Sequence, residues 1–448
     1  MLDFLFIHIY NIIGSDNMKA AFFTLGCKVN QYESEEIAEL LKQNGYEITD
    51  SKQSADVYIV NSCTVTAESN RKTRQAVRHF KTKNPDSIVV LTGCVPQAFP
   101  DEAIELSDYA DIILGNNNNR SIIEDISRLK EQKSRNCIVD IKQHTNEIEY
   151  NGGIISEFEG HTRAFVKIQD GCNRFCTYCA IPYARGRSRS KPLEDIKNEL
   201  KNLADGGFKE VVFVGINLSA YGKEIGYTLA DAVVAAEETD GIERIRLGSL
   251  EPDHITKEMM SIFAKCRKFC PQFHISLQSG CDTVLKRMNR HYTSAEYKEL
   301  VENLRNTFDD VSITTDIITG FPGETEDEFN TTVEFVKTIE FDKVHVFPYS
   351  IREGTKAAKM DSQLPNNIKS GRAAALGKIC EELRAQNFTR NTDKVFSVLF
   401  ETPKDGYQCG YTKNYTPVKV LTAENLTNEI KDVYITEASD DYCIGRLV

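Results

Sequence analysis

Short apolar runs alternate with stretches of helical periodicity in the first third of the chain. Four runs rich in Val, Ile, Phe and Leu predict buried strands at Ala20–Leu25, Asp56–Asn61, Ile88–Thr92 and Asp111–Leu114. In the stretch Glu35–Asn44 between the first two, Ile37, Leu40 and Leu41 recur at helical spacing, and Gly45 is a stop signal. This alternation predicts an open parallel α/β sheet.

The same alternation returns in the middle of the chain. Six strands are predicted at Ala164–Gln169, Glu210–Val214, Arg244–Leu247, Phe273–Leu277, Ser312–Ile318 and Lys343–Phe347. Helical stretches such as Leu193–Leu203 and Glu326–Thr338 lie between them. Six βα repeats predict a (β/α)6 partial barrel, whose functional groups lie at the carboxyl ends of its strands.

The C-terminal part of the chain shows a different pattern of apolar residues. A long helical stretch covers about Asn366–Arg390, and short β-like runs separated by Gly and Pro follow at Val395–Phe400, Tyr407–Tyr411, Pro417–Leu421 and Lys431–Glu437. We therefore expect an α/β protein with an N-terminal domain at 18–130, a linker at 131–157, a central domain at 158–388 and a small β-barrel at 389–448.

Residues 1–17 read MLDFLFIHIYNIIGSDN and are set apart from this plan. Their apolar run of about a dozen residues is too short to span a bilayer, and they lack the basic start of a signal peptide. We expect Met18 to be the natural start and residues 1–17 to be a non-native or disordered extension. The alternative is a short tail that binds a membrane surface or a partner.

Composition fits a globular protein of two or three domains, with 448 residues, 41% hydrophobic and 27% charged. The 13 cysteines are an odd number and follow no secretory signal, which favours metal ligation in a reducing cytoplasm over a disulfide framework.

Three cysteines stand in a C-x3-C-x2-C motif, namely Cys172, Cys176 and Cys179. Cys thiolates are the usual ligands of 4Fe–4S clusters, and three ligands leave one iron open for chemistry. The alternatives are three ordinary cytosolic thiols or structural zinc, which takes four ligands. The nearest other candidates are His161, Cys137 and Cys266, so no compact fourth ligand is present.

A second set follows three of the predicted strands, because Cys27, Cys63 and Cys94 each stand just past a strand end. Carboxyl ends of adjacent parallel strands open on one crevice, so the three could form another three-thiolate site. The alternative is that each is a small buried hydrophobic residue, as free Cys usually is.

The net charge of −12 argues mildly against a nucleic-acid partner, but two stretches are locally basic. Asn70–Lys83 carries six basic residues and no acid, and His161–Lys191 carries seven against Asp170 alone. The simple interpretation is a solvated helix and a loop. Because both stretches adjoin cysteine motifs, Arg71–Lys83 and Arg185–Lys191 are candidates to follow a polyanion backbone.

The chain resembles the methylthiotransferase family of radical S-adenosylmethionine enzymes over essentially its whole length from Met18. Leu25-Gly-Cys-Lys-Val-Asn-Gln-Tyr-Glu33 is similar to the family's N-terminal cluster motif, Asn61-Ser-Cys63 and Gly93-Cys94 to its further ligand motifs, and Gly171–Cys179 to its radical motif. The C-terminal module is similar to the small RNA-binding barrel called TRAM.

The resemblance implies two 4Fe–4S clusters. The cluster on Cys172, Cys176 and Cys179, the catalytic set, would cleave S-adenosylmethionine to a radical. The cluster on Cys27, Cys63 and Cys94 would hold or deliver the sulfur. One S-adenosylmethionine would supply the methyl group and another the radical. We expect an electron donor such as a flavodoxin or ferredoxin, no membrane contact and a monomer.

Family members differ in substrate. Leu25–Asn30 and His274–Asp282 look most like the branch that modifies threonylcarbamoyladenosine in tRNA, beside the anticodon. The alternatives are isopentenyladenosine in tRNA and an aspartate of ribosomal protein S12. Residues 386–448 carry seven basic and nine acidic residues, which is unusual for a tRNA-gripping module and would suit S12. An alternative of another class is a non-catalytic zinc-containing RNA-binding protein.

Several residues at predicted strand ends are candidates for binding S-adenosylmethionine. Tyr178 resembles the family's aromatic near the adenine, and Gly215 would allow close backbone approach. Arg290 is a candidate partner for the methionine carboxylate. The further candidates are Ser249, Glu251, Gln278 and Asp316. The alternative for each is turn geometry or strand capping.

Overall fold

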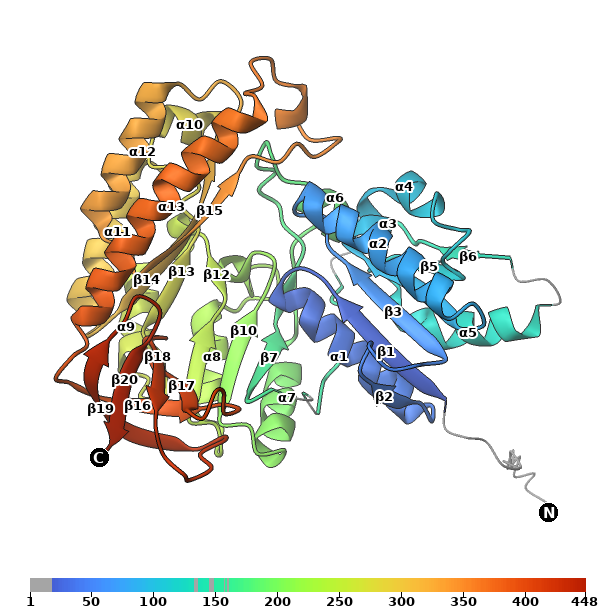
Figure 1. Cartoon of the computed structure of the whole chain (residues 1–448), viewed down its shortest axis with the longest axis horizontal. Coiled ribbons are helices and arrows are strands. Elements are labelled where there is room, and N and C mark those ends of the chain that lie inside the picture. Colours follow the sequence, from blue (N-terminus) through green and yellow to red (C-terminus); the bar gives the residue numbers. More distant parts are fainter. Residues whose placement is uncertain (1–17, 133–135, 145–148, 157, 159–160) are drawn as a thin grey trace.

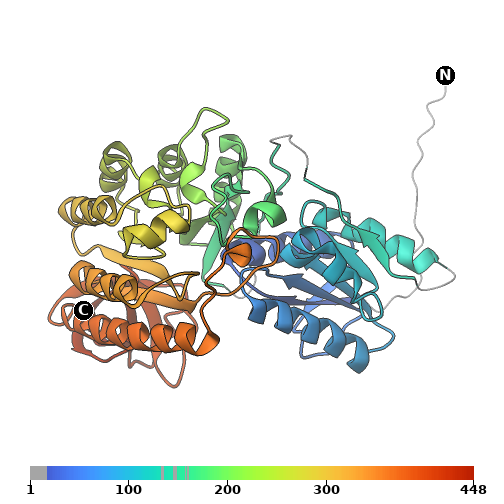
Figure 2. The same cartoon turned by 90° about the horizontal axis from the view of Figure 1, so that it is seen from above.

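A computed structural model describes residues 18–132, 136–144, 149–156, 158 and 161–448, so the predicted extension at 1–17 lies outside the described residues. Figure 1 shows an N-terminal sheet domain in blue and cyan, a central half-open barrel in green to orange and a small red barrel beneath it. In the view from above, the N-terminal domain lies beside the open edge of the central barrel (Figure 2).

The N-terminal domain is built on a six-stranded parallel sheet in the order β2-β1-β3-β4-β5-β6. Its strands are β1 Lys19–Thr24, β2 Glu47–Thr49, β3 Val57–Ser62, β4 Ile88–Gly93, β5 Ile112–Leu114 and β6 Ile138–Asp140. The four predicted strands are all present. The three-residue strands β2 and β6 are additional, and β6 comes from the segment expected to be a linker.

Helices cover both faces of this sheet. They are α1 Lys28–Gln43, α2 Ala67–Lys83, α3 Cys94–Ala98, α4 Pro100–Ile104 and α5 Ile122–Glu131. Apolar residues of α1 and α5 pack on one face, among them Leu41 and Ile126. Val77 and Phe80 of α2 pack on the other face, where the ring of Phe80 stacks on Tyr58 at 4.5 Å. The result is a three-layer domain whose strand ends remain free for function.

The central domain is the predicted (β/α)6 partial barrel. Its strands are β7 Arg163–Lys167, β10 Glu210–Val214, β11 Arg244–Leu247 continued by β12 Ser249–Leu250, β13 Gln272–Ile275, β14 Ser312–Thr319 and β15 Lys343–Pro348. They form two parallel sheets, joined where β11 runs into β12 and where Ile245 pairs with Phe269. A short β8 (Gln169–Asp170) and β9 (Arg189–Ser190) form a separate ribbon.

The outer face of these strands is apolar and is covered by helices. They are α7 Leu193–Asp205, α8 Leu229–Glu237, α9 Lys257–Lys265, α10 Asp282–Arg287, α11 Ser294–Thr307, α12 Glu326–Ile339 and α13 Asn366–Thr389. One contiguous core joins strand residues such as Phe213 and Ile275 to helix residues such as Leu200, Val233 and Val336. The short helix α6, Ile181–Arg185, lies instead at the boundary with the N-terminal domain.

The chain ends in a closed barrel of β16 Val395–Phe400, β17 Gln408–Thr412, β18 Pro417–Val420, β19 Ile430–Ala438 and β20 Cys443–Leu447. The sequence predicts four of these strands and misses β20. Buried Arg244 docks the barrel by donating to the carbonyl oxygens of Tyr411 at 2.9 Å and Ser397 at 2.8 Å. Within the described ranges, no helix is both long and apolar enough to cross a membrane.

Candidate metal centres

The loop between β8 and α6 carries the first cysteine set and is fixed by its backbone. Gly171 has a φ of +70°, and a Cβ there would lie 1.9 Å from the carbonyl oxygen of Arg187, so only glycine fits. The N–H of Cys172 donates to the carbonyl of Gly186 at 3.1 Å, and the N–H of Cys179 to that of Cys176 at 3.0 Å. These bonds wrap the three cysteines into one compact loop.

The sulfur atoms of this loop are partly buried, and N–H groups are directed at them. Backbone N–H groups lie 3.5 Å from Cys172 Sγ and 3.4 Å from Cys179 Sγ, and Arg290 Nη1 lies 3.2 Å from Cys176 Sγ. Burial raises the pKa of the Cys172 thiol and raises that of Cys179 to about 12. Thiols in such a site become thiolates only when a cation replaces the proton, as metal binding does.

The second cysteine set lies at the carboxyl ends of the strands of the N-terminal sheet. Cys27 caps α1, Cys63 follows β3 and Cys94 begins α3, so they stand at the ends of three adjacent parallel strands. The sulfur atoms of Cys27 and Cys94 lie 3.8 Å and 3.9 Å from the same atom, Oδ1 of Asn30. A Cβ on Gly26 would lie 2.7 Å from Cys63 Sγ, so this glycine permits the close approach.

Arg185, the last residue of α6, connects this set with the first loop. Its side chain is 1% exposed, and Nε lies 3.3 Å from Cys94 Sγ. Nη2 donates to Asn30 Oδ1 at 2.6 Å and to Glu33 Oε2 at 2.9 Å. Burial raises the pKa of Cys94 to about 12, and Arg185 is the first charge that opposes this effect.

Arg185 belongs to a buried network with an excess of positive charge. Lys167 pairs with Glu33 at 2.7 Å and with Asp170 at 2.8 Å, and Arg189 pairs with Asp170 at 2.9 Å. Burial alone would raise the pKa of Glu33, but Arg185 and Lys167 hold it below its usual value. Three cations thus face two carboxylates, and the guanidinium beside Cys94 is placed to stabilise a thiolate.

A cavity of about 630 Å³ opens between the three domains. Cys27 lines it from the N-terminal domain, Gly215, Ser249 and Asp316 from the central barrel, and Tyr415 from the C-terminal barrel. Asn217, two residues after Gly215, places Nδ2 4.0 Å from Cys172 Sγ. This volume is in the range of small-molecule sites. Cys27 of the second set lines the cavity, whereas the first set is connected to it only through Asn217.

The wall formed by β13, β14 and β15 is polar. It presents His274, Thr314, Asp316, Lys343 and His345 to the cavity. His274 Nε2 lies 3.3 Å from Asp316 Oδ2, and His274 Nδ1 lies 3.0 Å from Thr314 Oγ1. The interior of a closed eightfold barrel is usually filled by branched apolar side chains, so this wall is suited to a polar ligand.

Four of the predicted cofactor residues are held by close contacts. Arg290 and Glu251 form an ion pair, and Arg290 Nε donates to the hydroxyl of Tyr292 at 3.0 Å. Tyr178 packs edge-on against Phe321, with ring centroids 6.5 Å apart. A Cβ on Gly215 would lie 2.9 Å from Gln169 Oε1, which explains the glycine.

The other three candidates differ in position. Ser249 and Asp316 line the cavity, whereas Gln278 lies outside the wall that the described residues form. Gln278 has a φ of +69°, and its N–H donates to the carbonyl of Asp316 at 2.9 Å. Its visible role is therefore to shape the strand end.

The donor sets suit iron–sulfur clusters better than single ions. Among the described residues, no group of three Cys, His, Asp or Glu is arranged to hold one metal ion. A 4Fe–4S cubane offers each thiolate its own iron, so its ligands stand further apart than those of a single ion. Thiols surrounded by N–H donors and a buried cation also match the hydrogen bonding that clusters receive.

The two basic stretches differ in how far their side chains are exposed to solvent. Arg71–Lys83 lies within α2, with Arg78 and Lys83 exposed. The prediction that Arg185–Lys191 follows a polyanion is wrong for Arg185, Arg189 and Lys191, which are buried because carboxylates of other elements pair with them. Arg187 is exposed and lies over the ring of Phe175 at 5.2 Å.

Sequence reasoning also missed residues that build the site. Asn30 and Glu33 lie one and two turns along α1 from Cys27, and this spacing could have indicated a shared face. Asn217 and His274 carry no comparable signal, because only the barrel fold brings Asn217 to Cys172 and His274 to the cavity.

Two protein-family models match the chain. The model described as "Radical SAM superfamily" matches residues 166–336, and the one described as "Uncharacterized protein family UPF0004" matches residues 19–115. The first span contains Cys172, Cys176 and Cys179, and the second contains Cys27, Cys63 and Cys94.

Curated relatives match over nearly the whole chain. The threonylcarbamoyladenosine tRNA methylthiotransferase MtaB of Bacillus subtilis is 37% identical over 96% of this chain and 96% of its own length. MtaB of Aquifex aeolicus is 40% identical over 85% of this chain and 92% of its own. The tRNA-2-methylthio-N(6)-dimethylallyladenosine synthase of Clostridium tetani is 35% identical over 96% and 97%.

Solved structures are similar in fold. The radical S-adenosylmethionine methyltransferase TsrM of Kitasatospora setae superposes with a TM-score of 0.53 at 15% identity, covering 77% of this chain and 75% of that one. The cobalamin-dependent S-adenosylmethionine radical enzyme OxsB gives 0.52 at 13% identity, covering 82% and 56%.

Proposed function

Because the chain belongs to the methylthiotransferase family of radical S-adenosylmethionine enzymes, we propose that it adds a methylthio group to carbon 2 of N6-threonylcarbamoyladenosine beside the anticodon of tRNA. Membership makes the chain an enzyme that transfers a sulfur-containing group and uses S-adenosylmethionine with a 4Fe–4S cluster. The observation that carries the proposal is an interdomain cavity that Cys27 of the second set lines beside Gly215, from whose loop Asn217 reaches Cys172 of the first set.

We further propose two clusters. Cys172, Cys176 and Cys179 would hold one 4Fe–4S cluster, and Cys27, Cys63 and Cys94 would hold the second. When bound, the first supplies radical chemistry with S-adenosylmethionine and the second supplies a site for the sulfur. The chain's own contribution is to bury the thiols, direct N–H groups at them and place Arg185 beside Cys94.

The Arg290–Glu251 pair is matched to the zwitterionic amino-acid end of S-adenosylmethionine. A guanidinium binds a carboxylate and a carboxylate binds an ammonium, so each partner can exchange the other for a ligand group. Tyr178 would flank the adenine. Gly215, Ser249 and Asp316 would contact the remainder of the cofactor from the cavity wall, and Gln278 would act only by shaping the strand end beside Asp316.

The polar wall favours a threonylcarbamoyl substituent over a hydrocarbon one. Lys343 and His345 offer hydrogen bonds and charge beside the His274–Asp316 pair along β13–β15, and burying Lys343 and His345 against a hydrocarbon would leave their polar groups without a ligand partner. The 35% identity to dimethylallyladenosine synthases supports a second candidate, the isopentenylated nucleoside. A base in a single-stranded loop can splay out and enter such a cavity as a flipped base.

The cellular location, oligomeric state and partners that we propose follow from this reaction. We propose that the protein works in the cytoplasm as a monomer, takes electrons from a flavodoxin or ferredoxin and acts on the anticodon loop of tRNA.

Mass spectrometry of tRNA nucleosides tests the proposal. In cells without the gene, the 2-methylthio form of threonylcarbamoyladenosine should disappear and the unthiolated form accumulate. The gene with Cys172→Ala should not restore it, whereas Cys409→Ala, in the C-terminal barrel outside both cysteine sets, should. Loss of the methylthiolated isopentenyladenosine instead would establish the second candidate. An unchanged tRNA profile would refute both and direct attention to ribosomal protein S12.

A further inference from the structure

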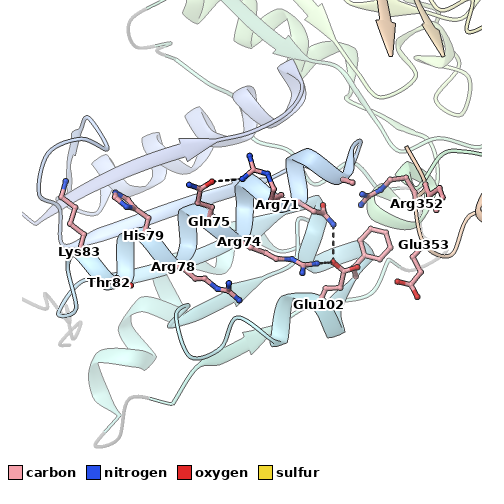
Figure 3. Close-up of a pocket in the computed structure, with 14 residues that line it drawn as sticks. Arg71, Arg74, Gln75, Arg78, His79, Thr82, Lys83, Glu102, Arg352 and Glu353 are labelled. Atoms are coloured by element: carbon pink, nitrogen blue, oxygen red, sulfur yellow. Dashed lines mark hydrogen bonds and ion pairs between the residues drawn. The ribbon is translucent and has the colours of Figure 1, made fainter. Parts of the chain in front are cut away.

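A groove of about 970 Å³ runs along the exposed face of α2. Residues of α2 and α4 form one side, and residues 351–353, which follow β15, close one end, so the groove lies between the N-terminal and central domains. Figure 3 shows basic side chains of α2 in a row, from Lys83 at the outer end to Arg71, with Arg352 of the central domain beyond them.

The groove has an excess of positive charge. Its lining carries five cationic side chains and two carboxylates, those of Glu102 and Glu353. Arg74 pairs with Glu102 at 2.6 Å. Arg78 and Lys83 are exposed and form no ion pair with another described residue, although Arg78 lies over the ring of Tyr109 at 5.5 Å. Such a row of cations attracts an extended polyanion.

The inner end of the groove reaches the second cysteine set. Arg352 is 6% exposed, and its Nη2 donates to Thr64 Oγ1 at 2.9 Å, next to Cys63. Its Nε is buried and has no hydrogen-bond partner in the described structure. A buried guanidinium N–H without a partner is costly, and an anionic oxygen is the group that would best satisfy it.

We infer that this groove binds the sugar–phosphate backbone of the RNA strand that leads to the modified nucleotide. The inference rests on the proposed function, which supplies tRNA as the substrate. The 17 residues of α2 extend about 25 Å, which matches about seven stacked nucleotides at roughly 3.4 Å each. Because phosphate contacts position a nucleic acid without reading its sequence, the groove sets the approach of the RNA, and the cavity selects the base.

The test compares two charge-reversal variants of the full chain with equal change in net charge. The groove variant carries Arg78→Glu and Lys83→Glu. The control carries Lys19→Glu and Lys52→Glu, two exposed lysines of the same domain outside the groove. Binding of an unthiolated tRNA transcript is measured over a range of salt concentrations, with a second transcript that lacks the target nucleotide. Iron content and cleavage of S-adenosylmethionine without RNA establish that each variant is folded.

Loss of two phosphate contacts should reduce the slope of log K against log salt by about 1.4 to 1.8, which corresponds to roughly 25- to 60-fold weaker binding at 0.1 M salt. Both transcripts should be affected alike, and the control should bind like the wild type. Equal affinity and slope in the groove variant, or an equal loss in the control, would overturn the inference and leave the proposed function standing. A wild type that binds neither transcript would overturn both.

Discussion

Arg185, the buried cation beside Cys94, allows the most direct test of the proposed second cluster. Arg185→Met keeps a long side chain and removes the charge whose Nε lies 3.3 Å from Cys94 Sγ. Reduction adds a negative charge to a cluster, and a nearby cation stabilises that charge. We therefore expect Arg185→Met to shift the midpoint potential of the N-terminal cluster to more negative values.

The size of the shift follows from Coulomb's law. Two unit charges about 4 Å apart interact by about 4 kcal/mol at an effective dielectric constant of about 20. For a one-electron couple, about 59 mV corresponds to 1.4 kcal/mol, so the upper limit is roughly 170 mV. Glu33 accepts from the same guanidinium at 2.9 Å and cancels part of its field. We expect a shift of about 80 mV.

The assay is a redox titration followed by electron paramagnetic resonance. Cys172, Cys176 and Cys179 are changed to Ala, so that the N-terminal cluster is observed alone. The matched control is Arg189→Met, which removes a cation of the same network that contacts Asp170 and the backbone carbonyls of Arg185 and Arg187. Arg189→Met should shift the potential less, and Arg185→Lys should restore most of the difference. A shift below about 20 mV, or one equal in both Met variants, would refute the reasoning.

Three further predictions address other parts of the molecule. Cys27→Ala should lower iron from about eight to about four per chain while cleavage of S-adenosylmethionine persists; loss of cleavage in an iron-loaded sample would contradict separate sites. Arg290→Lys should weaken binding of S-adenosylmethionine about tenfold in equilibrium dialysis, because the bidentate fork is lost, and unchanged binding would remove Arg290 from the site. Burial raises the pKa of Asp342 to about 6, so its contribution to stability is full below about pH 4 and is lost as pH rises through 6. Asp342→Asn should therefore flatten the pH dependence of the free energy of unfolding in that window by about 3 kcal/mol. Tm measured against pH should show this, and parallel curves for both proteins would contradict it.

Much of the fold was predictable because hydrophobic periodicity alone carries it. Runs such as Ile88–Thr92 and Glu210–Val214 are apolar on both faces, as strands of a covered parallel sheet must be. The structure confirms the (β/α)6 partial barrel and the small C-terminal barrel. The three-residue strands β2 and β6 were missed, because three residues are too few to show a period and neighbouring strands complete them.

The positions of the cysteine sites were predictable from the sequence, but only some of the residues that surround the cysteines were. The strand-end rule places Cys27, Cys63 and Cys94 at one sheet edge, as the structure does. Their role as ligands stays a prediction. Asn30, which both Cys27 and Cys94 contact, could have been suggested by helical spacing. The contact between Arg185 and Cys94 could not have been predicted. The two residues are 91 positions apart in the sequence, and only the packing of two domains brings them together.

The two basic stretches explain why local charge is a weak guide to partners. Both carry a similar excess of cations in the sequence, yet Arg185 and Lys191 are buried against Glu33 and Glu199, whereas Arg78 of α2 faces solvent. Two of the carboxylates that neutralise the buried stretch, Glu33 and Glu199, come from α1 and α7, elements that a charge count along the stretch does not see. A buried cation needs a partner to offset its lost hydration, while an exposed one needs none. The cations free to bind a polyanion are therefore those that the fold leaves exposed and unpaired, and among the described residues Arg78 and Lys83 of the α2 groove meet both conditions.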